Sequence, residues 1–194
     1  MDISEEKARL RSEIRARRRA LSDDERITAG QAVAERLACL EGLKEAKLAL
    51  AYMPMKYEID VLPAVERLKK LGKRIAFPLC IEDGGLRLFI PAEENGFEPG
   101  AYGILEPDAE RAEEVGADSL DAIILPAIGF DRELNRLGQG GGYYDRLLAK
   151  TSCFTVMVGF DCQLVDFVPT EALDRKADAL VTPSLTLEKS KKNN

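Results

Sequence analysis

The sequence contains no histidine among its 194 residues. This absence excludes Ser–His–Asp and Cys–His catalysis, histidine metal sites and a histidine general base. Any chemistry must therefore rest on carboxylates, arginine, lysine, tyrosine, backbone dipoles or a bound metal ion.

Long apolar runs and paired cysteines are also missing. No stretch approaches the roughly 18 uninterrupted apolar residues that span a bilayer, so we expect no membrane partner. The first residues are charged and helical in pattern, unlike a signal peptide, which predicts a cytoplasmic protein. Cys39, Cys80, Cys153 and Cys162 are widely spaced, without a Cys-x-x-Cys pair. We interpret all four as reduced structural thiols.

Acidic residues are scarce in one segment near the start of the chain. Residues 7 to 19 carry seven cations and one acid, a net charge of +6, whereas the whole chain carries −6 and the remainder therefore −12. An acidic body of this kind would repel a nucleic-acid backbone, so we expect no nucleic-acid partner. The basic stretch suits a smaller anion, such as a polyphosphate.

Strand and helix patterns alternate along a chain of single-domain length. We expect helices at residues 4–21 (capped by Ser4), from Ser22 through Leu40, at 60–72 and at 143–150, and strands at 47–52, 74–79, 86–90, 121–128, 154–160 and 179–182. This order predicts a single α/β domain over residues 1–188, with an open, mainly parallel sheet sandwiched by helices in a Rossmann-like three-layer arrangement. Residues 189–194 form a polar tail that we expect to be disordered.

Four glycines in five positions follow the most apolar strand. The segment from Arg136 to Asp145 reads Arg-Leu-Gly-Gln-Gly-Gly-Gly-Tyr-Tyr-Asp. Its glycines permit a concave nest of N–H donors for a phosphate, at the start of the helix expected from Tyr143. It is not a Walker A loop, because no Gly-Lys-Ser/Thr follows. A plain strand-to-helix turn is the alternative, which the flanking Arg136, tyrosines and Asp145 make less favourable.

Two further groups of residues lie where a ligand would be expected. Lys7 and Arg11 share one face of the first helix with Arg15 and Arg18 or Arg19, and we interpret the later arginines as solvated. Glu58 follows the first strand, where a carboxylate could accept hydrogen bonds from a pterin-like ring while Met53 offers an apolar wall, or it could simply be solvated. Asp60 fits a helix cap.

Together these segments resemble the 5-formyltetrahydrofolate cyclo-ligase family, also called 5,10-methenyltetrahydrofolate synthetase. The resemblance runs from Lys7-x-x-x-Arg11 to Thr182. Its most specific part is Leu125-Pro126, Phe130-Asp131 and the glycine segment, supported by Tyr52…Glu58-x-Asp60, Gly103-Ile104-x-Glu106-Pro107 and Gln163…Pro169-x-Glu171.

The resemblance implies that 5-formyltetrahydrofolate and ATP are converted to 5,10-methenyltetrahydrofolate, ADP and phosphate with Mg²⁺, through phosphorylation of the formyl oxygen. It implies the site residues as well. ATP would contact Lys7, Arg11 and the loop residues Arg136, Leu137, Gly138, Gln139, Gly140, Gly141, Gly142, Tyr143 and Tyr144, of which Arg136 and Tyr144 would be catalytic. The folate would contact Met53, Glu58, Gly140, Gly142 and Tyr143. Mg²⁺ would be held by Asp145 and Asp174.

Two departures from the family pattern stand in the chain. Leu134 occupies a position that is usually glycine, and Leu173 one that is usually histidine, beside Asp174. Asp174 is equally compatible with a turn carboxylate. These departures leave open a diverged or non-catalytic nucleotide- or folate-binding member, and a related phosphoryl transfer to another N-formyl substrate. We expect a monomer.

Overall fold

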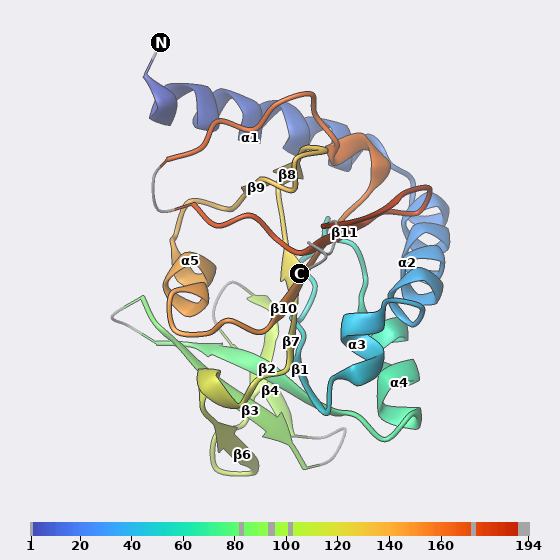
Figure 1. The fold of residues 1–194 in the computed structure, drawn as a ribbon, viewed down its shortest axis with the longest axis vertical. Helices are drawn as coiled ribbons and strands as arrows, with labels where there is room; N and C mark the ends of the chain where they lie inside the picture. The colour runs from blue at the N-terminus through green and yellow to red at the C-terminus, as the bar shows by residue number, and fades with distance from the viewer. Residues whose placement is uncertain (1, 82–83, 93–95, 101–102, 172–173, 190–194) are drawn as a thin grey trace, which may run out of the picture.

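The computed structural model describes residues 2–81, 84–92, 96–100, 103–171 and 174–189. Leu173 and residues 190–194, on which two of the expectations above fall, lie outside these ranges. An eight-stranded sheet forms the centre, in the order β12-β11-β10-β7-β1-β2-β3-β6 (Figure 1). The five strands from β11 to β2 are mutually parallel, and β12, β3 and β6 pair antiparallel at the two edges. The predicted open, mainly parallel sheet is confirmed.

The elements that the sequence predicted lie close to their expected places. The helices are α1 (Ile3–Ala20), α2 (Asp23–Leu37), α4 (Leu62–Lys70) and α5 (Tyr143–Leu148), and the strands are β1 (Leu48–Leu50), β2 (Arg74–Cys80), β3 (Leu86–Pro91), β7 (Ala122–Pro126), β10 (Phe154–Val158) and β11 (Ala179–Val181). The expected cap of α1 was wrong: α1 begins two residues after Met1 with Asp2, not Ser4, as its N-cap. The capping box of Ser22 and Glu25 is confirmed.

Several short elements were not predicted. They are the helix α3 (Glu41–Glu45) and the strands β4 (Phe97–Pro99), β5 (Leu105–Pro107), β6 (Ala112–Val115), β8 (Gly129–Phe130), β9 (Arg136–Leu137) and β12 (Thr186–Glu188). Two to five residues carry too little periodicity to be recognised in a sequence. The pair β8–β9 matters most here, because Arg136 leads directly from β9 into the glycine segment.

Apolar side chains fill both faces of the sheet. On one face Val33 and Leu37 of α2 and Val65 of α4 pack against alternate residues of the strands, such as Ile124. On the other face Leu147 and Leu148 of α5 join the cluster that contains Ile123 and its neighbours. Figure 1 shows α2, α3 and α4 on one side of the sheet and α5 on the other. Three layers result, as predicted.

Helix α1 crosses one end of this sandwich (Figure 1). Its buried Ile14 packs against Ile128, just after the carboxyl end of β7, against Leu137 of β9 and against Val168 in the loop after β10. The charged face of the helix therefore lies over the edge where ligands gather in open parallel sheets. No helix in the described part of the chain is long and apolar enough to cross a membrane.

Candidate functional site

A cavity of about 360 Å³ opens at the carboxyl end of the parallel strands. Apolar and aromatic side chains form much of its wall, and a few polar groups face into it, as in pockets for small molecules. The lining residues are Tyr52, Met53, Met55, Glu58, Pro78, Cys80, Leu86, Ile104, Pro126, Ala127, Arg136, Gly138 to Gly142, Tyr143, Tyr144 and Asp145. The structure thus brings the glycine segment, Met53 and Glu58 to a single cavity, although some eighty residues separate them in sequence.

The glycine segment depends on backbone conformations that favour glycine. Gly140 has φ +103° and Gly142 has φ +70°, both in the left-handed region. A Cβ on Gly142 would also lie 2.5 Å from Nη1 of Arg146. Arg146 in turn donates a hydrogen bond of 2.8 Å to the Gly141 carbonyl and one of 3.0 Å to the Gly84 carbonyl. The segment is therefore a loop of defined conformation rather than a plain turn, and Arg146 connects it by hydrogen bonds to Gly84, between β2 and β3.

Arg136 and Asp145 flank this loop as an ion pair, with Nη2 and Oδ1 2.5 Å apart. The Arg136 side chain is only 7% exposed, whereas that of Asp145 is 49% exposed. Arg136 also lies 6.0 Å from the centre of the Tyr144 ring. A nearly buried cation beside a glycine-rich loop is suited to bind the charge of a phosphate group.

Helix α1 contacts the same loop through its charged face. Arg11 donates a hydrogen bond of 2.8 Å from Nε to the Gly138 carbonyl. Burial, followed by the charge of Arg15, lowers the pKa of Arg11, while Asp145 and Asp174 both act in the opposite direction. Arg11 therefore lies within electrostatic reach of both carboxylates that were predicted to hold a metal ion.

Lys7 joins α1 to the loop after β10. Its Nζ lies 2.7 Å from Oδ2 of Asp174 and 2.8 Å from Oε2 of Glu171. Burial is the largest single influence on the pKa of Lys7 and lowers it, but the hydrogen bonds and charges of Asp174 and Glu171 together raise it above its ordinary value. Burial likewise raises the pKa of Asp174, but Lys7 and the Glu171 N–H outweigh it and the net shift is downward. Both groups are thus held in their charged forms.

Glu58 is oriented by two donors. Its Oε2 accepts a hydrogen bond of 3.1 Å from the Met55 N–H, and its Oε1 accepts one of 3.2 Å from Nε2 of Gln139. The Oε1 of Gln139 accepts a hydrogen bond of 2.9 Å from Arg15. A continuous chain of hydrogen bonds therefore runs from α1 through the glycine loop to the Glu58 carboxylate.

Two tyrosines complete the wall of the cavity. Burial and then the charge of Glu58 raise the pKa of the Tyr144 phenol above its usual value, although Arg136 acts against them. Burial and Glu58 raise the pKa of Tyr52 in the same way, and its hydroxyl donates to the Ile59 carbonyl. Tyr144 therefore remains protonated near neutral pH and presents a hydrogen-bond donor beside Arg136.

The carboxylates of the site form no ready-made metal cluster. Within the described ranges no group of three or more cysteines, aspartates or glutamates is placed to hold an ion. Mg²⁺, however, usually binds through one or two carboxylates, with phosphate oxygens and water completing its shell. Asp145 and Asp174 are held in separate ion pairs, with Arg136 and Lys7, and each could supply one such carboxylate.

The structure corrects two interpretations and identifies positioning residues that sequence reasoning missed. Arg18, expected to be solvated, is only 4% exposed and donates to the Tyr57 carbonyl, and Arg15 is bonded to Gln139. Buried Gln163 bonds the Ala127 and Ile128 carbonyls and the Phe160 N–H. Apart from the local bond to Phe160, these partners lie more than thirty residues away, so no local pattern indicated them. The cap expected at Asp60 was wrong by one residue: Val61 is the N-cap of α4, and Asp60, just before it, accepts a hydrogen bond from the Leu62 N–H.

Taken together, the fold and the site define a class: small α/β enzymes in which a glycine-rich loop and basic side chains border a ligand cavity at the edge of a parallel sheet. Comparison with known proteins narrows this class. The chain belongs to the 5-formyltetrahydrofolate cyclo-ligase family, whose model matches residues 3–183. Members of this family are ligases.

Individual relatives agree with this assignment. The chain is 33% identical to the 5-formyltetrahydrofolate cyclo-ligase of Escherichia coli K12 over 180 residues, which cover 90% of this chain and 99% of that protein. It is 31% identical to the enzyme of the same name from Mycolicibacterium smegmatis, over 91% and 93% of the two chains. The structure of the 5,10-methenyltetrahydrofolate synthetase of Aquifex aeolicus superposes with a TM-score of 0.84 at 32% identity, over 97% and 95% of the two chains. The fold class and the family predicted from the sequence are both confirmed.

Proposed function

We propose that this protein converts 5-formyltetrahydrofolate and ATP to 5,10-methenyltetrahydrofolate, ADP and phosphate. The family assignment supports this reaction. The observation that carries it is the meeting, in one cavity, of Glu58 with a glycine loop that Arg11 and Arg136 border. One side of the cavity thus offers a carboxylate and apolar walls to a ring, and the other offers N–H groups and cations to phosphates.

ATP would lie along the glycine loop. Lys7, Arg11 and Arg136 would contact its phosphates, together with the backbone from Leu137 to Gly142 and with Gln139, Tyr143 and Tyr144. Lys7 and Arg136 are held in ion pairs with carboxylates, so binding of the nucleotide would exchange these partners for phosphate oxygens. Preorganised cations in a partly buried site stabilise a transferring phosphoryl group more strongly than cations in water.

The folate would insert its ring between Met53 and the glycine loop. Glu58 would accept hydrogen bonds from the ring edge, and Gly140, Gly142 and Tyr143 would border the formyl group. Because Gln139 and the Met55 N–H already fix both oxygens of Glu58, the carboxylate is preoriented for that contact. Preorganisation of this kind lowers the entropic cost of binding.

The reaction then needs positioning rather than a covalent nucleophile. The formyl oxygen attacks the γ-phosphorus, its bond to phosphorus forms, and the bond from phosphorus to the β–γ bridging oxygen breaks to release ADP. N10 next adds to the activated formyl carbon and loses its proton, and the carbon–oxygen bond breaks to release inorganic phosphate. Arg136 and the protonated Tyr144 would stabilise the negative charge on the phosphoryl oxygens. A histidine-free protein can supply all of these functions.

Mg²⁺ would be held by Asp145 and Asp174 and would neutralise charge on the nucleotide phosphates. Asp145 has the more exposed side chain of the two and presents it at the edge of the cavity, whereas Asp174 is bound by Lys7. We also propose that the protein acts in the cytoplasm as a monomer. The −12 charge outside residues 7–19 argues against a nucleic-acid partner.

The test is an absorbance assay of the purified protein with 5-formyltetrahydrofolate, ATP and magnesium. We expect near-ultraviolet absorbance of the methenyl product to rise, and to require both ATP and magnesium. The altered Leu134 and Leu173 define the competing hypothesis of a diverged binding protein. That hypothesis predicts that ATP and the folate bind without any rise in absorbance.

A further inference from the structure

A second cavity, of about 540 Å³, adjoins the first. It lies under the later turns of α1, and its volume falls within the usual range of about 300–1,000 Å³ for ligand pockets. Its lining residues are Arg15, Arg18, Arg19, Met53, Pro54, Met55, Lys56, Tyr57, Leu62, Gly103, Ile104, Leu105, Ile128 and Gln139. Nothing in the proposed reaction at the glycine loop uses this space.

The charge of this second cavity is of one sign. Four of its lining residues are cations, Arg15, Arg18, Arg19 and Lys56, and none is acidic. Acidic residues outnumber basic ones in the chain as a whole, by 34 to 28. A one-signed cavity on an acidic protein therefore raises the local concentration of anions at this position.

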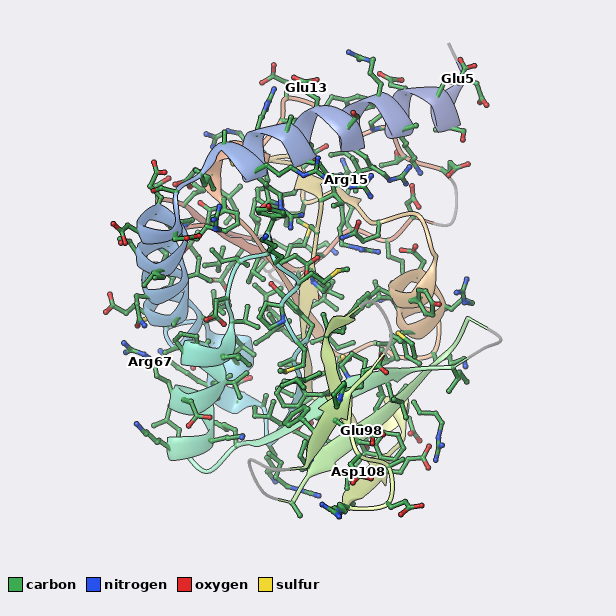
Figure 2. All side chains as sticks on the ribbon, turned by 180° about the vertical axis from the view of Figure 1, so that it is seen from behind. Glu5, Glu13, Arg15, Arg67, Glu98 and Asp108 are labelled. Carbon is green, nitrogen blue, oxygen red and sulfur yellow. The ribbon has the colours of Figure 1, made fainter. Side chains whose placement is uncertain are left out.

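The cations are arranged around a fixed platform. Arg18 is 4% exposed and donates a hydrogen bond of 2.5 Å to the Tyr57 carbonyl, which fixes the loop that carries Lys56. The Tyr57 ring lies 6.0 Å from the guanidinium carbon of Arg19 and 5.4 Å from Nζ of Lys56. Arg19 and Lys56 are exposed, so their charged ends remain available to a ligand. In Figure 2 Arg15 lies on the side of α1 that faces the body of the molecule, whereas Glu13 points away from it.

The two cavities share a wall. Met53, Met55, Ile104 and Gln139 line both of them. A long ligand whose ring is bound at Glu58 can therefore extend past the two methionines into the cationic space. A folate has this form, because its ring system is joined through an apolar aryl group to a glutamate with two carboxylates.

We propose that this second cavity binds the glutamate end of the folate, with Arg19 and Lys56 as the residues that recognise its carboxylates. The inference rests on the proposed function for the identity of the ligand. Arg18 holds the Tyr57 platform in place, and Arg15 remains engaged with Gln139. Binding of the tail here places the ring beside Glu58. These contacts contribute to the affinity for the folate and not to the rate of phosphoryl transfer.

The test compares two substrates and four proteins. 5-Formyltetrahydrofolate and 5-formyltetrahydropteroate, which lacks the glutamate, are assayed with the wild type, with the double variant Arg19→Ala/Lys56→Ala, with Lys56→Glu and with Arg17→Ala. Arg17 lies on the same helix, is paired with Glu13 and does not line either cavity, so it is the matched control. Dissociation constants are measured by calorimetry alongside KM and kcat.

We expect the double variant to raise the dissociation constant and KM of the folate by about 10-fold, a loss typical of two partly exposed charge contacts, with kcat unchanged. The pteroate should bind the wild type as weakly as it binds the double variant. Lys56→Glu should weaken folate binding further, because it places a like charge beside the tail. Arg17→Ala should leave both substrates unaffected.

Equal losses for the two substrates, or a wild type that binds both equally well, would overturn the proposal. Calorimetry measures binding without product formation, so this result does not depend on whether the protein has cyclo-ligase activity. If the wild type binds the folate without forming product, the cyclo-ligase activity fails while the comparison of the two ligands still decides where the glutamate binds.

Discussion

Leu134 has a backbone conformation that leucine rarely adopts, with φ +65°. It lies in the turn between β8 and β9, where Asp131 accepts hydrogen bonds from the N–H groups of Glu133 and Asn135 and, at its other oxygen, from the Asn135 side chain and the Val168 N–H. The side chain of Leu134 is buried in the core beneath α5. The left-handed region costs a non-glycine residue about 1–2 kcal/mol, which the packing of the side chain offsets.

Two substitutions at Leu134 separate backbone strain from packing. Both Leu134→Ala and Leu134→Gly lose the buried side chain, at about 2–5 kcal/mol. Because only glycine relieves the strain at positive φ, we expect Leu134→Gly to be the more stable of the two by about 1 kcal/mol, the reverse of their usual order. Urea unfolding of the two variants measures the difference. If the alanine variant is the more stable, the turn has no left-handed strain to relieve.

Arg136 is the residue on which the proposed chemistry depends most. It borders the loop from a nearly buried position, so no other cation can easily replace it. We expect Arg136→Ala to reduce kcat by about 10²- to 10³-fold, because one donor to the transferring phosphoryl group is lost. Arg132→Ala, in the same loop region but exposed, should retain wild-type turnover. A wild-type kcat in Arg136→Ala would remove this residue from the mechanism.

Helix α1 is the element that closes the site. Its Ile14 supplies an apolar contact, but its alignment depends on polar bonds from Lys7, Arg11, Arg15 and Arg18 to three separate segments. These bonds are spaced along the helix at three and four residues and so lie along one face. The helix therefore positions several functional groups at once.

The bond between Lys7 and Asp174 makes the stability of this element depend on pH. We expect Lys7→Met to lose about 1–2 kcal/mol of unfolding free energy near neutral pH, since its partner Glu171 is largely exposed. The lowered pKa of Asp174 stabilises the fold above pH 3.8, and that contribution is lost as the pH falls below 3.8 through the folded-state pKa. The difference between variant and wild type should therefore shrink in acid.

Urea titrations of wild type and Lys7→Met between pH 7 and pH 3 measure this effect, with the exposed Arg9→Met as the control on the same helix. The raised pKa of Lys7 acts at the other extreme: its contribution is complete below pH 10.5 and is lost only as the pH rises through the higher folded-state value. A difference that stays constant down to pH 3 would mean that Asp174 does not stabilise α1 through its charge.

Elements with a strong period could be predicted from the sequence, and so could the glycine loop. The capping box at Ser22 and the apolar run of β7 are local signals. The glycine segment is a local signal too, because its glycines indicate a backbone conformation that other residues rarely adopt. The partners of Arg18 and Gln163 could not be predicted, since each bonds carbonyls that only the folded topology brings near. Within the candidate site, the sequence indicated which residues would lie around the cavity, but not the ion pairs that Lys7 and Arg136 form with carboxylates. The ligands that these residues bind stay predictions.

At the scale of the whole molecule, Gln139 links helix α1, the glycine loop and Glu58, and so would link the two proposed substrate positions. Its side chain lines both cavities, donates to Glu58 and accepts from Arg15, while its backbone belongs to the glycine loop. A nucleotide that orders this loop would therefore also order Glu58. By thermodynamic linkage each ligand then strengthens the other by the same factor.

We expect a non-hydrolysable ATP analogue to tighten folate binding to the wild type, and Gln139→Ala to lose about fivefold of this coupling, or about 1 kcal/mol. Calorimetric titrations of the folate with and without the analogue measure it. Gln31→Ala, an exposed glutamine on α2, serves as control. Unchanged coupling in Gln139→Ala would show that the two ligands communicate by another route, or act independently.

The polar bonds of α1 also bear on how the chain is made. Their acceptors at Tyr57, Gly138, Gln139, Glu171 and Asp174 lie 39 to 167 residues beyond their donors. On the ribosome this helix is synthesised early, yet most of its acceptors emerge more than a hundred residues later. Docking of α1 is therefore a late event, and contacts this distant in sequence form slowly. The side chains of α1 proposed to bind phosphate would be brought into place only after the glycine segment and the loop that carries Asp174 have been made, so nucleotide binding would report that α1 has docked.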